Sequence, residues 1–409
     1  MVHDGSHSQL ELMQARVKFV PSGWAFNYVG KAFAIKNNLR KPISESEREK
    51  NPGAYPYYGP TKVQGYIGTF EQDGSYALIG EDGDHFLKYK SQPMTQLVDG
   101  KCTVNNHAHI IEGTNKASRE WFYYYFMHRD IFSFLSRQGA GRYKLNKASL
   151  EKVPVLVPPL PEQNKIAQIL FTWDKAITTT KQLIANSQQQ KKALMQQLLT
   201  GNKRLLDKNG VRFSGEWKTY KFGSLFNERV ETGRDDLPLL SITADDGVVN
   251  QEDTGRKNTS NEDKSKYRRI CVNDIGYNTM RMWQGRSSLS DKEGIVSPAY
   301  TIITPTGKVC PAYAAYLFKL PALIHVFYRH SQGLVSDTWN LKFNHFKKIS
   351  WQLSSIDEQQ KIAVVLSTAD QEISALQQKL DALKQEKKAL MQQLLTGKRR
   401  VKIDDKEVT

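Results

Sequence analysis

The feature that most constrains this chain is an internal repeat at about half its length. Residues 191–201 read Lys-Lys-Ala-Leu-Met-Gln-Gln-Leu-Leu-Thr-Gly, and residues 387–397 read the same, an offset of 196 positions (387 minus 191). The same offset carries Glu162-Gln163 onto Glu358-Gln359. A chain of 409 residues with this period is best interpreted as two copies of one unit.

Each copy predicts a long helix that ends at Gly201 or Gly397, because glycine suits a helix C-cap. Upstream of both glycines, core-facing positions follow one another at alternating spacings of four and three residues, which is the pattern of a heptad seam. The seam positions are Ile166, Leu170, Trp173, Ile177, Thr180, Ile184, Ser187, Lys191, Leu194 and Leu198, then Ile362, Leu366, Ala369, Ile373, Leu376, Leu380, Leu383, Lys387, Leu390 and Leu394. The prolines at 158, 159 and 161 hold the chain extended and prevent an earlier start of the first helix.

The direction of the two helices follows from a length argument. A helix over about 162–200 is ~58 Å long, whereas a compact domain of ~140 residues has a radius of gyration near 14 Å. The domain between the two helices cannot easily bridge that length, so an antiparallel pair is predicted, with pseudo-two-fold symmetry.

The segments outside the helices are predicted to form two mixed α/β domains, so the fold class is α+β. Aromatic and β-branched runs lie between turn signals, with strands expected near 76–79, 107–111, 239–242 and 299–303 and helices near 118–126 and 312–318. The predicted parts are a lead-in (1–16), a first domain (17–157), a central helix (158–201), a second domain (202–353), a C-terminal helix (354–397) and a charged tail (398–409).

Charge points to the class of ligand. The chain has 58 Lys and Arg against 42 Asp and Glu, a net charge of +16, which favours a polyanion such as nucleic acid. No signal peptide or membrane span is recognisable, and the three cysteines are read as reduced thiols, so a cytoplasmic location is expected.

Sequence motifs of catalysis are missing. The chain has no phosphate-binding loop of the Gly-x-x-x-x-Gly-Lys-Ser/Thr type, no Gly-x-Ser-x-Gly elbow and no Asn/Asp-Pro-Pro-aromatic motif of amino methylation. His107 and His109 have the spacing of two metal ligands on one strand face, but ordinary strand residues are the favoured interpretation because no third ligand is evident. We therefore expect no catalytic residue and no bound metal.

Residues suited to DNA recognition are more numerous. Basic side chains hold phosphates, arginine also pairs with guanine, and glutamine pairs with adenine. The candidates are Tyr57, Tyr58, Lys62, Gln64, Arg142, Tyr143 and Lys144 in the first domain, and Arg256, Lys257, Arg268, Arg269, Arg281, Trp283, Gln284, Arg286, Trp339 and Asn340 in the second. The alternative is a solvated basic surface with a few core aromatics.

Several motifs together give the chain a resemblance to a known family. They are Pro-Leu-Pro-Glu-Gln-x-Lys-Ile-Ala at 159–167, the two identical helix endings, Tyr-Pro-Tyr-Tyr-Gly at 55–59, Leu-Ile-Gly-Glu-Asp-Gly at 78–83, Met-Arg-Met-Trp-Gln-Gly at 280–285 and Gly-Ile-Val-Ser-Pro-Ala-Tyr at 294–300. In these motifs the chain resembles the specificity subunit of type I restriction–modification enzymes.

The resemblance implies that each domain is a target recognition domain that reads one half of an asymmetric bipartite DNA sequence. The helices would set the spacer and dock two methyltransferase (modification) subunits, with restriction/translocase subunits in the full complex. S-adenosylmethionine, ATP and Mg would be bound by those partners. The candidates for partner docking are Glu162, Gln163, Lys191, Lys192, Gln196, Glu358, Gln359, Lys387, Lys388 and Gln392.

Two other interpretations remain open at this stage. The chain could be a coiled-coil adaptor that binds DNA without sequence preference. A fused nuclease–methylase is the third, and the missing motifs make it the weakest.

Overall fold

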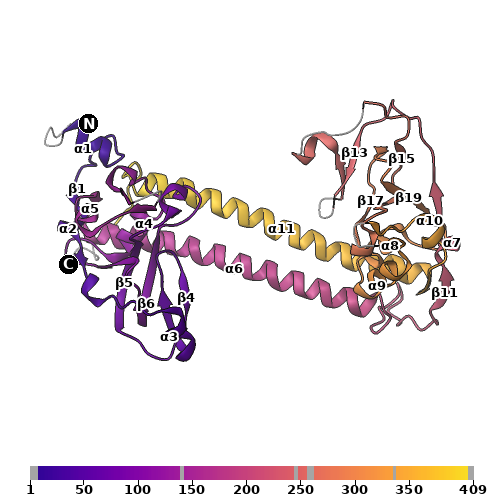
Figure 1. Cartoon of the computed structure of the whole chain (residues 1–409), viewed down its shortest axis with the longest axis horizontal. Helices are drawn as coiled ribbons and strands as arrows, with labels where there is room; N and C mark the ends of the chain where they lie inside the picture. The colour runs from indigo at the N-terminus through magenta and orange to yellow at the C-terminus, as the bar shows by residue number, and fades with distance from the viewer. Residues whose placement is uncertain (1–7, 139–141, 244–246, 256–261, 335–337, 404–409) are drawn as a thin grey trace. The chain divides into compact units, whose positions relative to one another are not determined.

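The computed structural model describes residues 8–138, 142–243, 247–255, 262–334 and 338–403. The chain divides into two compact units, which are described separately. Unit 1 is residues 1–180 with residues 379–409, and unit 2 is residues 181–378. Each unit contains one globular domain, the start of one long helix and the end of the other (Figure 1).

Unit 1 is built on a six-stranded sheet in which only the contact of β3 with β6 is parallel. Strand alternation gives the sheet two buried faces: Ala77 and Ile79 join the main core of the unit, and Leu78 joins a smaller cluster on the other face. In sheet order the strands are β2 (Ala34–Ile35), β7 (Ala108–Glu112), β5 (Gln72–Gly80), β6 (Thr95–Val104), β3 (Pro52–Tyr58) and β4 (Val63–Ile67).

Helix α4 (Arg119–Phe126) packs on this sheet and fills the main core of unit 1 with aromatic side chains. Ser118 caps it by accepting a hydrogen bond from the Trp121 amide. The remaining elements are α1 (Gln9–Gln14), β1 (Ala25–Tyr28), α2 (Val29–Ala32), η1 (Asn37–Leu39), α3 (Glu45–Lys50), η2 (Asp84–Lys88), η3 (Phe132–Phe134), β8 (Ser136–Gln138), β9 (Arg142–Lys144), α5 (Lys147–Glu151) and β10 (Pro154–Val157).

Unit 2 has a four-stranded sheet, β12-β19-β16-β17, and three separate strand pairs. The four strands are β12 (Phe226–Arg229), β19 (Tyr300–Pro305), β16 (Ile275–Asn278) and β17 (Ser287–Leu289). The pairs are β11 (Lys218–Lys221) with β20 (Ser350–Leu353), β13 (Leu240–Ile242) with β14 (Val248–Asn250), and β15 (Arg268–Ile270) with β18 (Gly294–Val296).

Short helices complete unit 2. They are α7 (Phe222–Leu225), η4 (Gln251–Thr254), η5 (Met282–Gln284), α8 (Pro311–Leu317), α9 (Pro321–His330) and α10 (Phe343–Phe346). Prolines at the first positions of α8 and α9 fit, because the first amides of a helix need no partner inside it. Each predicted strand and helix of the two domains overlaps an observed element and extends beyond it by at most one residue.

The two long helices are α6 (Leu160–Leu198) and α11 (Ile356–Leu394), each 39 residues. They end in glycines with positive φ, +76° at Gly201 and +66° at Gly397, the conformation that the repeat predicted. Within unit 1 the start of α6 lies beside the end of α11, and within unit 2 the end of α6 lies beside the start of α11. The helices are therefore antiparallel in each unit, and the predicted fold class is confirmed.

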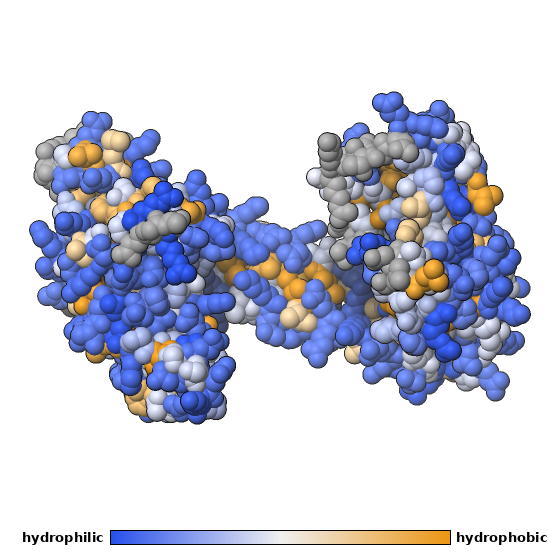
Figure 2. Space-filling view, in the orientation of Figure 1, coloured by the Kyte–Doolittle hydropathy of each residue, from blue (hydrophilic) through white to orange (hydrophobic). Residues whose placement is uncertain are grey.

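The heptad seam is the inward face of both helices. None of its members falls among the exposed residues, and the most buried include Leu170, Ile184, Leu198, Leu366 and Leu394. Hydrophilic residues cover most of the face shown in Figure 2. Among the described residues, no helix is long and apolar enough to cross a membrane.

Candidate nucleic-acid interface

The first repeated contact joins the start of each long helix to a helix of the adjoining domain. The Gln163 amide oxygen accepts from the Ser118 amide (2.8 Å), and its nitrogen donates to the carbonyls of Lys116 (2.9 Å) and Pro158 (2.7 Å). Gln359 repeats this with the Cys310 amide (2.9 Å) and the Ser354 carbonyl (2.9 Å). Both amides therefore satisfy buried backbone groups at a helix N-terminus.

The second repeated contact is an arginine clasp on the neighbouring glutamate. Arg400 binds the Glu162 carboxylate through two nitrogens (2.6 and 2.8 Å), and Arg204 binds Glu358 in the same way (2.6 and 2.7 Å). The hydrogen bonds that Arg204 donates to Glu358 raise the pKa of Arg204. The positions differ by 196 in both residues, so the chain beyond α11 does in unit 1 what the chain beyond α6 does in unit 2.

The third repeated contact lies inside the seam. Lys387 pairs with Asp174 (2.5 Å), which also accepts from the Tyr124 hydroxyl (3.0 Å). In unit 2 the triad is Lys191, Asp370 (2.5 Å) and Tyr316, whose hydroxyl lies 2.7 Å from Asp370. Burial and the aspartate raise the pKa of both tyrosines, which stay neutral donors.

These contacts correct part of the predicted docking set. Glu162, Gln163, Glu358 and Gln359 are at most 1% exposed, and their side chains are bound within their own unit. Lys191 and Lys387 are likewise held by an aspartate in the seam, so these six residues stabilise the chain rather than face a partner. The exposed members remain predicted docking residues: Lys192, Gln196, Lys388 and Gln392.

Unit 1 carries a pair of adjacent loops at one end of its sheet. The first follows β5 and the second is the β8–β9 hairpin, whose last strand runs beside the first loop. The Gly83 amide donates to the Tyr143 carbonyl (3.1 Å), and the Leu145 amide donates to the Glu81 carbonyl (2.7 Å). We call residues 80–84 with residues 142–145 the unit 1 loop pair.

A depression of about 370 Å³ opens on the unit 1 loop pair. It is lined by Pro60, Gln64, Asp82, Gly83, Asp84, His107 and Arg142. His107 Nδ1 lies 2.8 Å from the Asp82 carboxylate, and Gln64 accepts a hydrogen bond from Asn105 (2.9 Å). The depression thus combines a cation, carboxylates and an amide, which are groups that bind base edges.

Beneath the loop pair, Glu81 is surrounded by positive charge. Arg40 binds its carboxylate, and Lys144 Nζ lies 3.3 Å away. Burial alone would raise the pKa of Glu81, but Arg40, His109 and Lys144 outweigh it and hold the pKa below its usual range. Lys144, a predicted DNA contact, therefore also neutralises a carboxylate of its own unit.

Unit 2 carries an equivalent pair of loops. The first, between β16 and β17, contains η5, and the second is closed by backbone hydrogen bonds in both directions between Gln332 and Asn340 (2.8 Å each). The Leu341 amide donates to the Thr279 carbonyl (2.8 Å) and joins the two loops. We call residues 278–286 with residues 338–341 the unit 2 loop pair.

The two loop pairs correspond at the repeat offset. Tyr143 and Trp339 are 196 positions apart, as are the fully buried Leu145 and Leu341 behind them. The repeat therefore extends upstream of the helices into the domains, although the surface side chains have diverged. The offset between the two loop pairs can be read from the sequence, but two matching leucines are too few to reveal it without the structure.

The unit 2 loop pair gathers most of the predicted contacts of that domain. Arg281, Gln284 and Arg286 are exposed around η5, and the Trp283 indole packs edge-on against Trp339 with ring centroids 5.3 Å apart. Asn340 is half-buried and donates to the Thr338 carbonyl (3.1 Å). Gly285 is required here, since a Cβ at its φ of +75° would lie 2.7 Å from Ile324.

Other predicted DNA contacts lie elsewhere. Tyr57 is 1% exposed, and its hydroxyl accepts from the Ile43 amide, so its assignment as a DNA contact was wrong. Tyr58 is half-buried against the small core cluster of unit 1. Lys62 is exposed in the β3–β4 turn, near Gln64 in sequence.

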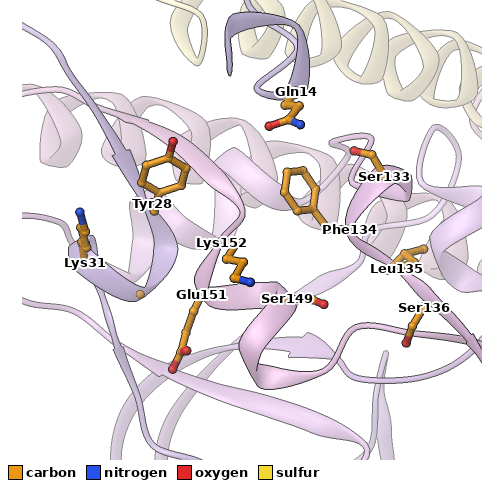
Figure 3. Close-up of a pocket in the computed structure, with 11 residues that line it drawn as sticks. Gln14, Tyr28, Lys31, Ser133, Phe134, Leu135, Ser136, Ser149, Glu151 and Lys152 are labelled. Atoms are coloured by element: carbon orange, nitrogen blue, oxygen red, sulfur yellow. The ribbon is translucent and has the colours of Figure 1, made fainter. Parts of the chain in front are cut away.

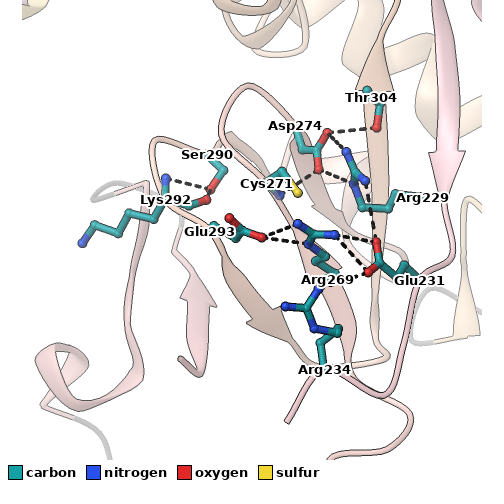
Figure 4. A network of polar contacts seen from close by, with 10 residues as sticks. All are labelled: Arg229, Glu231, Arg234, Arg269, Cys271, Asp274, Ser290, Lys292, Glu293 and Thr304. Atoms are coloured by element: carbon teal, nitrogen blue, oxygen red, sulfur yellow. Dashed lines mark hydrogen bonds and ion pairs between the residues drawn. The ribbon is translucent and has the colours of Figure 1, made fainter. Parts of the chain in front are cut away.

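Arg268 and Arg269 are also bound by carboxylates of unit 2, and their contact with DNA stays a prediction. Arg268 pairs with Glu228 (2.8 Å), and Arg269 pairs with Glu231 (3.0 Å) and Glu293. Figure 4 shows Arg269 between its two glutamates, beside a second group in which Arg229 clasps the buried Asp274. The sequence identified Arg268 and Arg269 but not their acidic neighbours, which lie 24 to 40 positions away. Arg256 and Lys257 lie outside the described residues.

Unit 1 has a further depression of about 810 Å³ (Figure 3). It is lined by Gln14, Tyr28, Gly30, Lys31, Ser133, Phe134, Leu135, Ser136, Ser149, Glu151 and Lys152. Three serines are present, but none of the eleven lining residues is a histidine that could activate them. The sequence did not identify this depression, and its residue types show no catalytic arrangement.

His107 and His109, which have the spacing of two metal ligands, both make hydrogen bonds within unit 1. His109 is fully buried, with Nε2 2.6 Å from the Leu145 carbonyl and Nδ1 2.8 Å from the Asn37 amide nitrogen. In the part of the chain that the structure describes, no three His, Cys, Asp or Glu residues are grouped to hold a metal ion. The interpretation as ordinary strand residues is therefore the better one.

Comparisons with known proteins agree with the resemblance seen in the motifs. Residues 21–186 match the family model described as "Type I restriction modification DNA specificity domain". The putative type I restriction enzyme specificity subunit S.HindORF215P of Haemophilus influenzae is 38% identical over 136 residues, 33% of this chain and 34% of that protein. The type I restriction enzyme MjaVIII specificity subunit of Methanocaldococcus jannaschii is 25% identical over 185 residues, 44% and 43% of the two chains.

The fold is also found in solved structures. The S subunit of a type I restriction–modification system from M. genitalium superposes with a TM-score of 0.60 at 15% identity, covering 92% of this chain and 96% of that one. A chain from a study of complex assembly and conformational transition of the type I R-M system gives 0.50 at 14% identity, covering 93% and 100%. The aligned segments span only about a third to two-fifths of the two curated relatives, so partners and targets are treated as proposals.

Proposed function

We propose, from the similarity of this chain to type I restriction–modification specificity subunits, that it is such a subunit and reads an asymmetric bipartite sequence in double-stranded DNA. The unit 1 loop pair reads one half of the sequence, and the unit 2 loop pair reads the other. The chain itself carries no catalytic residues, and methylation and cleavage belong to partner subunits.

One observation carries this proposal: the same loop pair occurs in both units, on a shared framework, with different exposed side chains. Leu145 and Leu341 are buried alike, whereas the surface has Arg142, Asp82 and Asp84 in unit 1 and Arg281, Gln284 and Arg286 in unit 2. A position that keeps its framework and varies its surface is suited to recognising different ligands of one class.

The side chains fit the base edges of the major groove. Arginine donates two hydrogen bonds to guanine, glutamine pairs with adenine, and a carboxylate accepts from the cytosine amino group. Carboxylates line the depression of unit 1, whereas none lies among the described residues of the unit 2 loop pair. The two half-sites are therefore proposed to differ, with a C·G pair favoured in the half that unit 1 reads.

The long helices are proposed to fix the separation of the half-sites and to dock two methyltransferase subunits. Their outer faces carry the exposed residues Lys192, Gln196, Lys388 and Gln392, which repeat at the same offset in both helices. S-adenosylmethionine would be bound by these methyltransferases, and ATP and Mg by restriction/translocase subunits.

The proposal is tested by replacing recognition residues and mapping the methylated sequences in the host genome. Arg281→Ala and Gln284→Ala should relax the half-site read by unit 2 by about 1–3 kcal/mol per lost base contact and leave the other half-site unchanged. Arg142→Ala should do the reverse. An equal loss of affinity for every sequence would show that these residues contact phosphates and not bases.

The alternative, an adaptor without sequence preference, makes a different prediction. Competition binding at fixed salt, with the modification subunit present, should show preference for one bipartite duplex. If the affinity depends on salt alone, the chain is an adaptor without sequence preference, and the proposed specificity function is wrong.

A further inference from the structure

Each loop pair contains an aromatic ring that packs against a second ring, tilted by 56° in unit 1 and edge-on in unit 2, and stays partly exposed. In unit 1, Tyr143 lies 5.3 Å from Phe132, which is 48% exposed. In unit 2, the Trp339 ring centroid lies 4.9 Å from that of Tyr328, which is 42% exposed. Trp283, in η5, packs on Trp339 as a third ring. The rings at 143 and 339 occupy equivalent positions in the repeat.

Core packing accounts for only part of these rings: Tyr143 packs against the main core of unit 1 but stays partly exposed, whereas other aromatics of each unit are fully buried. Trp121 and Phe122 in unit 1 and Phe318 and Phe346 in unit 2 have no exposed surface. Leaving a large ring half in water forgoes part of its burial free energy. Two divergent domains that keep this arrangement at one place indicate a ligand that covers it.

The charge around the rings favours DNA as that ligand. In unit 2, the described segments 275–290, 308–334 and 338–349 contain no Asp or Glu. They contain the basic residues Arg281, Arg286, Lys308, Lys319, Arg329, Lys342, Lys347 and Lys348. In unit 1 the charge is mixed. The Arg137 guanidinium lies 5.8 Å from the Tyr143 ring centroid and Arg142 precedes it, while Asp130, which pairs with Arg16, accepts from the Phe132 amide (3.0 Å).

Aromatic rings beside cations bind nucleic acid in a particular way. They stack on bases that have left the helical stack, and this stacking is tolerant of sequence. In a paired duplex the base faces are hidden, so a stacking surface becomes useful only where the duplex is opened. Enzymes that modify a base must extrude it, which unstacks its neighbours.

We propose that Tyr143 with Phe132, and Trp339 with Tyr328 and Trp283, are stacking platforms that hold DNA bases unstacked when each half-site is opened for modification. The inference rests on the proposed function and adds a step to it: these rings stabilise the opened duplex, while neighbouring polar side chains read the sequence. The platforms bind base faces and do not take part in methyl transfer.

The test uses the full chain assembled with its modification subunit and duplexes carrying 2-aminopurine beside the base that is methylated in each half-site. Trp339→Ala should reduce the fluorescence increase on binding and slow methylation of the unit 2 half-site by roughly 5- to 100-fold, the range expected for loss of one stacked base. Tyr143→Ala should act on the other half-site. Trp339→Phe and Tyr143→Phe keep a ring and should restore most of both signals.

A mismatch opposite the base that is methylated distinguishes a stacking platform from other roles of these rings. Because the mismatch lowers the energy needed to open the duplex, it should rescue methylation by Trp339→Ala. The proposal is overturned if the mismatch gives no rescue, if the preferred half-site sequence changes, or if the variant no longer retains the modification subunit in a pull-down. If the unaltered complex shows no sequence preference, the proposed function fails, and this readout does not depend on the alanine variants.

Discussion

At the residue scale, the two arginine clasps are chemically alike, but their glutamates accept different numbers of hydrogen bonds from other side chains. Glu162 also accepts a hydrogen bond from the Trp24 indole (3.0 Å), whereas Glu358 lacks this contact and the Trp217 indole nitrogen has no partner among the described residues. A buried carboxylate that loses its arginine is costly unless other donors remain. The two clasps should therefore respond differently to the same mutation.

Arg204→Ala should lower the free energy of unfolding by roughly 2–4 kcal/mol and Arg400→Ala by roughly 1–2 kcal/mol, because the second variant leaves Trp24 as a donor. Chemical denaturation of both variants measures the difference. Lys398→Ala, on the exposed chain next to the second clasp, is the control and should change little. Equal losses for the two arginine variants would mean that Trp24 contributes nothing.

His109 makes unit 1 sensitive to acid. Burial lowers its pKa, and its neutral ring donates to the Leu145 carbonyl and accepts from Asn37, with Arg40, Lys144 and Glu81 nearby. Because the unfolded chain takes up a proton more readily, this residue stabilises unit 1 fully above the unfolded pKa of ~6.5, and the stability falls as the pH drops below it. Glu81, whose pKa is also lowered, adds a further loss below about 4.3.

We expect thermal melting of the chain to lose stability from pH 7 to pH 5 and His109→Gln to reduce that slope. Gln keeps a donor for the Leu145 carbonyl without titrating. Part of the slope should persist, since burial also lowers the pKa of His85 and His128. An unchanged slope in the variant would show that His109 is not a source of the acid sensitivity.

At the scale of elements, the identical helix endings have different surroundings. A Cβ on Gly397 would lie 2.3 Å from Pro21, whereas a Cβ on Gly201 would lie 3.2 Å from the flat Trp217 ring. Both glycines have positive φ, as does Gly210, where a Cβ would meet nothing within 4 Å. Gly210→Ala therefore measures the conformational cost alone.

Gly210→Ala and Gly201→Ala should each cost about 1 kcal/mol of stability, and Gly397→Ala should cost clearly more because Pro21 must move. Thermal unfolding of the three variants tests this order. If Gly397→Ala matched Gly210→Ala, the close approach to Pro21 would have no energetic consequence.

The long helices were predictable because their pattern is local. A heptad seam, a glycine cap and a proline-rich start specify a helix within the segment itself, and the observed bounds fall within the expected 158–201 and 354–397. The loop pairs were not predictable as sites. Asp82 and Arg142 meet only because the β8–β9 hairpin folds back on the end of β5, across 60 positions of sequence.

At the scale of the whole molecule, the proposed ruler function of the helices can be tested by length. Inserting seven residues, which is one heptad or two helical turns, into both α6 and α11 preserves the seam. Genome-wide mapping of methylation should then show both half-sites unchanged and more unread base pairs between them. Unchanged spacing would contradict the ruler. Insertion into one helix only is the matched control and should destabilise the chain, because the two seams no longer align.

The sequence by itself determined the duplication, the two seam-forming helices and the basic character of the chain, because these follow from periodicity and composition. It also singled out Trp283, Gln284 and Trp339, which the structure brings to one surface. Only the tertiary structure decided which polar residues are available to a ligand. Glu162, Gln163, Arg268 and Arg269 resemble surface residues in sequence, yet partners far along the chain bind them, because a buried or half-buried charge must be paired.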